Sequence, residues 1–178
     1  EIRPRPDELA HLQSVIDLVV GERDKALADA QSAVQANPQS AVARIALSYA
    51  QQARFDLSGA RASVEKAVEL DPRNALAWAR LAELQSAFGE LDKVQESARK
   101  AAELAPELSR TQTVLGFAHL TRIETGPARQ AFDKAIGLDS SDPLPRLGLG
   151  LAKIREGMLG EGARDLEIAA SLDPNNAI

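Results

Sequence analysis

Four prolines recur at a fixed interval along this chain of 178 residues. Pro38, Pro72 and Pro106 follow one another every 34 residues, and Pro174 comes after two further intervals of the same length. The phrase GLDSSDP, with Ser140 at the proline position, fills the gap between the last two. A fixed period of this length indicates tandem copies of one supersecondary unit. We therefore expect five gapless repeats over 7–176, namely 7–40, 41–74, 75–108, 109–142 and 143–176.

Each repeat is expected to contain two helices joined by a short turn. Glycine at the turn of repeats 1, 3 and 5 suits the left-handed conformation that ends a helix. Phe55 stands at this place in repeat 2, and Asp56 beside it is expected to cap the following helix. The closing proline lacks an N–H group, so it ends the second helix. The expected helices span 8–20, 22–36, 41–54, 57–70, 75–88, 91–104, 109–122, 126–138, 144–156 and 160–172.

Recurring residues mark fixed places within the two helices. The first helices share a leucine and the second helices share an alanine: Leu47, Leu81, Leu115 and Leu149, and Ala33, Ala67, Ala101, Ala135 and Ala169. Trp78 lies three residues before its leucine. These marks resemble the tetratricopeptide repeat, a 34-residue helix–turn–helix family whose pattern joins a tryptophan, a leucine followed by a small residue, a tyrosine, later small residues and the proline. The tyrosine place here is held by Asp17, Gln51, Gln85, His119 and Lys153.

The resemblance covers 170 of the 178 residues and implies an all-α fold, a right-handed α-solenoid of antiparallel helix pairs. A constant offset between pairs curves such a solenoid and gives it a concave face. Residues 1–6 are expected to form an extended leader, since Pro4 and Pro6 disfavour helix at the residues before them. Residues 177–178 match the openings of earlier repeats and are expected to begin a further one.

The resemblance places function on the concave face, which this family builds mainly from first helices. A helix needs only one apolar stripe to pack on its partner, yet several first helices here carry a second. In repeat 5 this second stripe is Leu147, Leu151 and Ile154, while Leu149 and Ala152 are expected in the core. An exposed apolar patch of this kind marks a contact site. The residues expected to contact a partner are His11, Val15, Ile45, Tyr49, Glu83, Arg110, Thr113, Phe117, Leu120, Leu147, Leu151 and Ile154.

The second stripe has an equally simple interpretation as ordinary packing, because a helix inside a solenoid contacts several neighbours and apolar side chains are most often buried. The best-known ligand mode of the family is a carboxylate clamp of Lys, Arg and Asn side chains. The matching places hold His11, Val15, Ile45, Tyr49 and Ala79, none with a fixed positive charge, and the nearest basic residues are Arg80 and Arg110. We therefore reject the clamp and expect a protein or peptide ligand with an apolar or amphipathic segment.

Composition excludes several other classes of function. The net charge of −5 argues against nucleic acid, which needs clustered positive charge. No apolar run approaches 18 residues, so no membrane span is expected. The absence of cysteine removes thiol chemistry and Cys-ligated zinc, and no cofactor is expected. It suits either redox state, which leaves the cytoplasm and the periplasm both open.

No catalytic constellation is expected either. His11 and His119 lie in different repeats with no nucleophile spaced to either. Gly148 and Gly150 lack the preceding strand and the further motif residues of a phosphate loop, and a close helix contact explains them better. The chain is therefore predicted not to be an enzyme.

Two alternatives to a binding scaffold remain at this stage. One is a structural spacer or a self-association module, in which the last helix exposes Leu166, Ala169 and Ala170 because no capping repeat covers them. The other is a subunit of an enzyme whose chemistry lies outside this piece. The abundance of alanine, and of arginine over lysine, is typical of many bacterial proteins.

Overall fold

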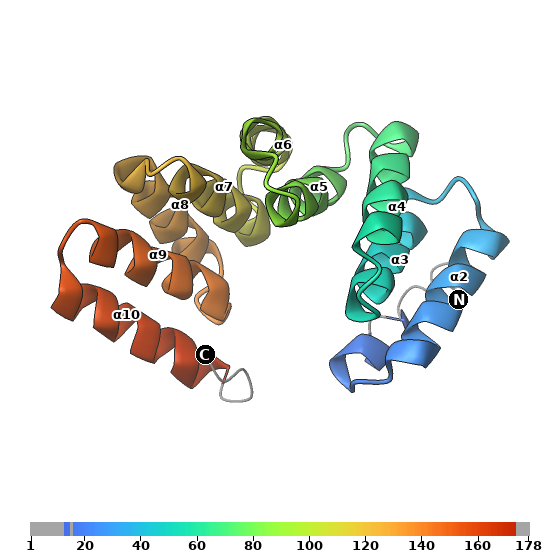
Figure 1. Cartoon of the computed structure of the whole chain (residues 1–178), viewed down its shortest axis with the longest axis horizontal. Helices are drawn as coiled ribbons and strands as arrows, with labels where there is room; N and C mark the ends of the chain where they lie inside the picture. The colour runs from blue at the N-terminus through green and yellow to red at the C-terminus, as the bar shows by residue number, and fades with distance from the viewer. Residues whose placement is uncertain (1–12, 15, 174–178) are drawn as a thin grey trace. The chain divides into compact units, whose positions relative to one another are not determined.

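The computed structural model describes residues 13–14 and 16–173, and this part of the chain contains helices and turns but no strand (Figure 1). Residues 13–14 and 16–19 are helical and precede the first complete helix. The predicted leader 1–6, the contact residues His11 and Val15, and 177–178 lie outside the described residues. The complete helices are α2 (Arg23–Ala36), α3 (Ala41–Ala53), α4 (Leu57–Leu70), α5 (Ala75–Ala87), α6 (Leu91–Leu104), α7 (Ser109–Thr121), α8 (Thr125–Leu138), α9 (Pro143–Arg155) and α10 (Leu159–Leu172).

The all-α prediction is confirmed, and the helices keep the expected register. The first helices α3, α5, α7 and α9 begin every 34 residues, and so do the second helices. The division into five repeats, with the boundaries 7–40, 41–74, 75–108, 109–142 and 143–176, stays a prediction. The chain separates into two compact halves, an N-terminal half (Glu1–Leu84) and a C-terminal half (Gln85–Ile178), whose boundary falls within α5.

The core of the N-terminal half is built from small side chains. Ala26 and Ala30 of α2 pack against Ala46, Leu47 and Ala50 of α3. A second cluster joins α4 to α5 through Ala60, Val64, Leu81 and Leu84, with Trp78 packed against it. Alanine lets helix axes approach closely, so that leucine and valine fill the remaining space at crystal-like density.

The core of the C-terminal half surrounds one buried aromatic ring. Phe132 of α8 is fully buried among Leu120, Ala128, Leu149 and Ala152. The ring fits because α7 and α9 present glycine to it. A Cβ atom added at Gly116 would lie 2.5 Å from Phe132 Cε1, and one at Gly148 would overlap the same ring. The expectation that Gly148 serves close helix contact is confirmed.

Each turn within a helix pair contains one residue with positive φ. Gly21, Gly89 and Gly157 hold this position in repeats 1, 3 and 5, with φ between 72° and 84°. Phe55 and Ile123 hold it in repeats 2 and 4, with φ of 63° and 62°. A bulky or β-branched residue rarely adopts this conformation, which costs free energy relative to glycine.

Two of the polar residues at the tyrosine place, Gln51 and Lys153, bond to a residue twelve positions later in the second helix. Gln51 and Ser63 are hydrogen-bonded at 2.6 Å. Lys153 Nζ donates to Asp165 Oδ2 at 2.6 Å, and Asp165 is buried. A polar contact between the two helices of a pair therefore replaces the packing that a tyrosine would supply. Asp56 accepts a hydrogen bond from the Gly59 amide at 2.8 Å, as predicted for a helix cap.

Candidate interaction surfaces

Three of the predicted contact residues are buried within the helix stack. Ile45 packs in a cluster with Ala67 of α4. Leu120 belongs to the cluster around Phe132. The hydroxyl of Thr113 donates to the backbone carbonyl of the residue one turn before it, at 2.9 Å. These three side chains stabilise the fold and present no open face, so the packing interpretation of the second stripe holds for them.

The remaining described contact residues are half-buried, except for Leu151, which is exposed. Phe117 contacts Phe132 edge-on, with ring centroids 5.0 Å apart at 74°. Its expected exposure is therefore only partial. The half-buried set is Tyr49, Glu83, Arg110, Phe117, Leu147 and Ile154.

An open apolar stripe runs along α9 in the C-terminal half. It consists of Leu144, Leu147, Leu151 and Ile154, and we call it the α9 stripe. Leu144 and Leu151 are each 41% exposed, and the other two are half-buried. The spacing i, i+3, i+7, i+10 places all four on one side of the helix. The opposite side, with Leu149 and Ala152, is buried.

Leu144 was missed by the sequence analysis, although the repeat register contains the signal. Val42, Leu76 and Leu144 all occupy the second position of a first helix, and all three are exposed. Arg110 holds the same position in α7. Aligning the repeats at this position would have identified an exposed apolar residue in three helices out of four.

A pocket of about 390 Å³ lies in the N-terminal half, where the helical residues 16–19 meet the end of α3. We call it the turn pocket, because its walls include the first residue of α2 and the turn after α3. Its lining residues are Leu18, Arg23, Tyr49, Gln52, Ala53 and Phe55. Tyr49 is the member of this set that the sequence predicted.

Arg80 fixes one wall of the turn pocket from inside the fold. It is 3% exposed, and its Nε donates to Ser48 Oγ at 3.0 Å. Its Nη2 donates to Gln52 Oε1 at 2.6 Å, and its guanidinium lies 3.8 Å from the centroid of the Tyr49 ring. Arg80 therefore braces α5 against α3. It is not available for the carboxylate clamp for which the sequence left it as a candidate.

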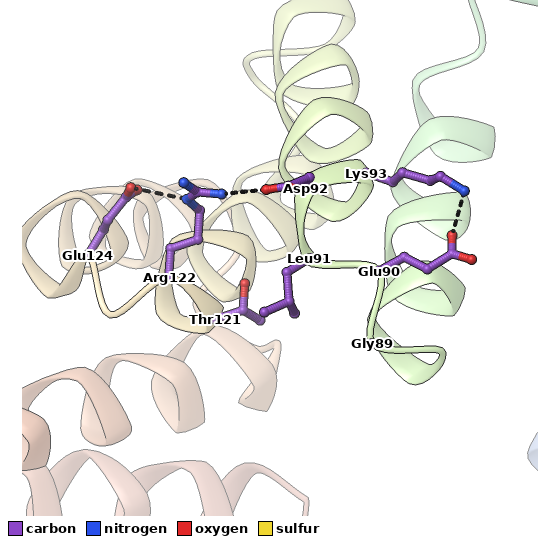
Figure 2. Close-up of a pocket in the computed structure, with 8 residues that line it drawn as sticks. All are labelled: Gly89, Glu90, Leu91, Asp92, Lys93, Thr121, Arg122 and Glu124. Atoms are coloured by element: carbon purple, nitrogen blue, oxygen red, sulfur yellow. Dashed lines mark hydrogen bonds and ion pairs between the residues drawn. The ribbon is translucent and has the colours of Figure 1, made fainter.

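A second pocket, of about 680 Å³, lies in the C-terminal half between the turn before α6 and the end of α7 (Figure 2). Its charged side chains pair with one another, either across the pocket or within one of its sides (Figure 2). Arg122 Nη1 lies 2.9 Å from Asp92 Oδ1, and Lys93 Nζ lies 3.1 Å from Glu90 Oε2 (Figure 2). Because both cations already have carboxylate partners, this pocket offers no uncompensated positive charge to a ligand.

The residues that could suggest catalysis have structural roles in the described part of the chain. The ring of His119 lies 2.6 Å from Glu124 Oε2, and this hydrogen bond holds the pKa of Glu124 below its usual range. Among residues 13–14 and 16–173, no three His, Asp or Glu side chains cluster in a way that could hold a metal ion. Within the same residues, no helix is both long and apolar enough to cross a bilayer.

The predicted self-association face of α10 is different from the one that the structure presents. Leu166 packs toward Gly150, and Ala169 is buried, so these two side chains face α9 rather than solvent. Ala170 is exposed as predicted. The large apolar side chains that α10 exposes are Leu159, Ile168 and Leu172.

Comparison with known proteins identifies the repeat. Residues 64–96 match the family model of the tetratricopeptide repeat. This segment of the chain is therefore tetratricopeptide-repeat sequence. No curated protein sequence matches it. Tetratricopeptide repeats generally form a scaffold fold for protein–protein interaction and do not themselves catalyse reactions.

Solved tetratricopeptide-repeat structures share the fold at low sequence identity. A thermophilic TPR protein of Thermus thermophilus superposes with a TM-score of 0.83 at 20% identity, over 96% of this chain and 93% of that one. PilF of Pseudomonas aeruginosa gives 0.77 at 21% identity, over 96% of this chain and 78% of that one. YrrB, a TPR protein with an unusual peptide-binding site, gives 0.61 at 15% identity, over 92% of this chain and 84% of that one. At such identities the likeness concerns the fold alone.

Proposed function

We propose that this chain is a protein-interaction scaffold that binds an apolar or amphipathic peptide segment along its first helices, on the side that tetratricopeptide repeats turn toward their concave groove. The observation that carries this proposal is the α9 stripe. Two of its leucines stay exposed although the opposite side of the same helix is fully packed. Ile154, at the end of the stripe, packs close to Gly162 of α10, but the exposed surfaces of Leu144 and Leu151 are available to a partner.

The α9 stripe favours a ligand with apolar side chains at matching intervals. An amphipathic helix presents such side chains at i, i+3 or i+4, and i+7, and buries them in an apolar groove. YrrB, which shares the fold, has a peptide-binding site by its description.

The double variant Leu144→Ser, Leu151→Ser tests this proposal. Both side chains are exposed, so the variant should fold, while a partner held by the stripe should be lost. Leu138→Ser is the matched control, because it removes an exposed leucine from the end of α8, outside the stripe. Affinity capture from the source organism should recover a partner with wild type and with the control but not with the double variant. Equal recovery by all three would overturn the proposal.

Self-association is the second candidate, and the exposed side chains of α10 support it. Leu159, Ile168 and Leu172 lie on the last described helix and have no neighbouring helix in the described residues to cover them. If two copies meet through α10, the mass measured by light scattering should rise with concentration, and Ile168→Ser with Leu172→Ser should abolish the rise. A mass that stays monomeric at all concentrations would exclude this candidate.

A further inference from the structure

Arg23, at the rim of the turn pocket, has no carboxylate partner among the described residues. It is the first residue of α2 and is exposed to solvent. It contacts an aromatic ring, with its guanidinium carbon 5.9 Å from the centroid of the Phe55 ring. The neighbouring cations Lys25 and Arg54 are paired with Asp17 and Asp24. Arg23 therefore offers the uncompensated positive charge at this pocket.

Phe55 is held in a conformation that its residue type disfavours, and its ring is left in solvent. It has a φ of 63° and is 84% exposed. Glycine occupies the same turn position in repeats 1, 3 and 5 without this strain. Strained backbone conformations persist where the surroundings impose them, and they are found at ligand clamps. Ile123 has the same conformation at the equivalent turn of repeat 4 and is 73% exposed, so the feature that distinguishes Phe55 is its aromatic ring beside Arg23.

The opposite wall of the turn pocket, formed by Tyr49 and Gln52, is held by contacts made within the fold. Buried Arg80 stacks on the Tyr49 ring at 3.8 Å and also donates hydrogen bonds to Gln52 and Ser48, and these contacts favour one position for the Tyr49 ring. Gln52 is thereby fixed as well. Preorganised walls reduce the entropy lost when a ligand binds.

We propose that the turn pocket binds a bulky apolar side chain, aromatic or branched aliphatic, that has a carboxylate next to it. The apolar group packs between Tyr49, Ala53 and Phe55, and the carboxylate pairs with Arg23. A volume of about 390 Å³ lies at the lower end of the range for small-ligand pockets, which suits one residue and its carboxylate. The inference rests on the proposed function in one respect, since it makes this residue an anchor of the bound peptide.

The corresponding position in the C-terminal half provides an internal comparison. Leu91 stands 68 residues after Arg23 and lines the second pocket, and Ile123 stands 68 residues after Phe55. The cations of the second pocket are paired with Asp92 and Glu90 (Figure 2). We therefore expect the turn pocket, but not the second pocket, to bind a ligand with a carboxylate more tightly than the same ligand without one.

Small probes test the chemistry without knowledge of the natural partner. The isotope-labelled chain is titrated with N-acetylphenylalanine, its carboxamide and N-acetylalanine, and amide chemical shifts are followed by NMR. The acid should shift the signals of residues 52–56 and Arg23, with a dissociation constant on the order of 1 mM, which is ordinary for a ligand of this size. The carboxamide should bind roughly 3- to 10-fold more weakly, and N-acetylalanine should not bind.

The carboxylate could belong to the C-terminus of a chain or to an acidic side chain, and two peptides distinguish these sources. Acetyl-Ala-Ala-Phe offers a chain terminus, and acetyl-Ala-Phe-Asp-Ala-amide offers an acidic side chain after the aromatic residue. Tighter binding of the first means that the pocket reads a C-terminus, and tighter binding of the second means an internal acidic motif. Failure of both peptides and of the acid probe at residues 52–56 would overturn the inference.

Three variants assign the roles within the turn pocket. Arg23→Gln should remove the preference for the acid over the carboxamide and leave carboxamide binding unchanged. Phe55→Gly should weaken both probes and keep the fold, because glycine suits the positive φ. Ile123→Gly makes the same change at the equivalent turn of repeat 4 and should leave the titration unchanged. An unaltered acid preference in Arg23→Gln would contradict the assignment.

The probe titration and the partner-capture experiment test the two proposals independently. If the probes bind as expected but no partner is lost from the Leu144→Ser, Leu151→Ser variant, the stripe proposal fails and the pocket stands. If that variant loses its partner while the probes cause no shifts at residues 52–56, the pocket fails and the stripe proposal stands.

Discussion

Arg80 shows what a single buried charge does in this fold. Its side chain crosses from α5 to α3, donates to Ser48 and Gln52, and covers the ring of Tyr49. Arg80→Met keeps much of the aliphatic volume but leaves these acceptors without a donor in a buried site. We expect a loss of about 3 kcal/mol of unfolding free energy, measured by urea denaturation followed through the fluorescence of Trp78, the single tryptophan.

Arg73→Met is the control for the removal of an arginine. Arg73 is exposed in the turn before α5, so this variant should change the unfolding free energy by less than about 0.5 kcal/mol. Equal stability of Arg80→Met and wild type would mean that the contacts of Arg80 with α3 contribute nothing to stability. It would also mean that these contacts do not hold the wall of the turn pocket in place.

A carboxyl pair in repeat 1 makes stability depend on pH. The Oδ2 atoms of Asp17 and Asp29 are both buried without a hydrogen-bond partner, so a proton held between the two carboxyl groups would stabilise the pair. Burial, with the neighbouring Asp17 carboxyl, raises the pKa of Asp29 above 3.8, while the hydrogen bond from Lys25 lowers the pKa of Asp17. Of the two carboxyl groups, Asp29 therefore binds a proton more readily than Asp17.

The sign of the effect follows from the raised pKa of Asp29. Its contribution to stability is complete below pH 3.8, the ordinary carboxyl value, and is lost as the pH rises through the raised value in the folded state. Asp29→Asn keeps a donor toward Asp17 at every pH, so it should be more stable than wild type at pH 7, with no such advantage at pH 3.5. Chemical denaturation at the two pH values measures this difference. Asp24→Asn, which removes an exposed carboxylate, should show no comparable gain.

At the scale of the helices, glycines determine which neighbouring helices can pack closely together. Gly148 of α9 faces the buried ring of Phe132, so Gly148→Ala forces the ring or the helix to move and should cost about 1–3 kcal/mol. Gly137→Ala in the last turn of α8 meets no atom within 4 Å and should instead stabilise by up to about 1 kcal/mol. Thermal and urea unfolding distinguish the two. If Gly148→Ala unfolds like wild type, the ring has room that the structure does not show.

The helices themselves could be predicted from sequence because their signals are local. A closing proline such as Pro106, and an alanine such as Ala101 one turn and a half earlier, recur at fixed places and depend on no neighbour. The open surface could not be predicted in the same way. Ile45 and Leu144 are both apolar residues of first helices, yet the first is buried and the second exposed. The difference depends on which side chains of the adjacent helices reach them.

The turn pocket was beyond sequence analysis for a related reason. Arg23 and Phe55 are 32 residues apart and belong to different repeats, and neither matches a family mark. The departure from glycine at Phe55 was visible in the sequence. Its meaning, an exposed ring beneath an unpaired guanidinium, required the packing of one repeat on the next.

At the scale of the whole molecule, a destabilising substitution should lower the stability of its own repeat and of the neighbouring repeats only. In a repeat protein each unit contacts only its neighbours, so stability is close to a sum of intrinsic and nearest-neighbour contributions. Arg80→Met removes bonds between α3 and α5 and should speed amide hydrogen exchange in Ala41–Ala87, while Pro143–Leu172 keep wild-type protection. Gly148→Ala should produce the opposite pattern, because Phe132 lies in the C-terminal half. Mass spectrometry of exchanged peptides resolves the two regions. Uniform loss of protection in either variant would show that the array unfolds as one cooperative body, and a partner bound to one set of repeats could then influence the far end of the chain.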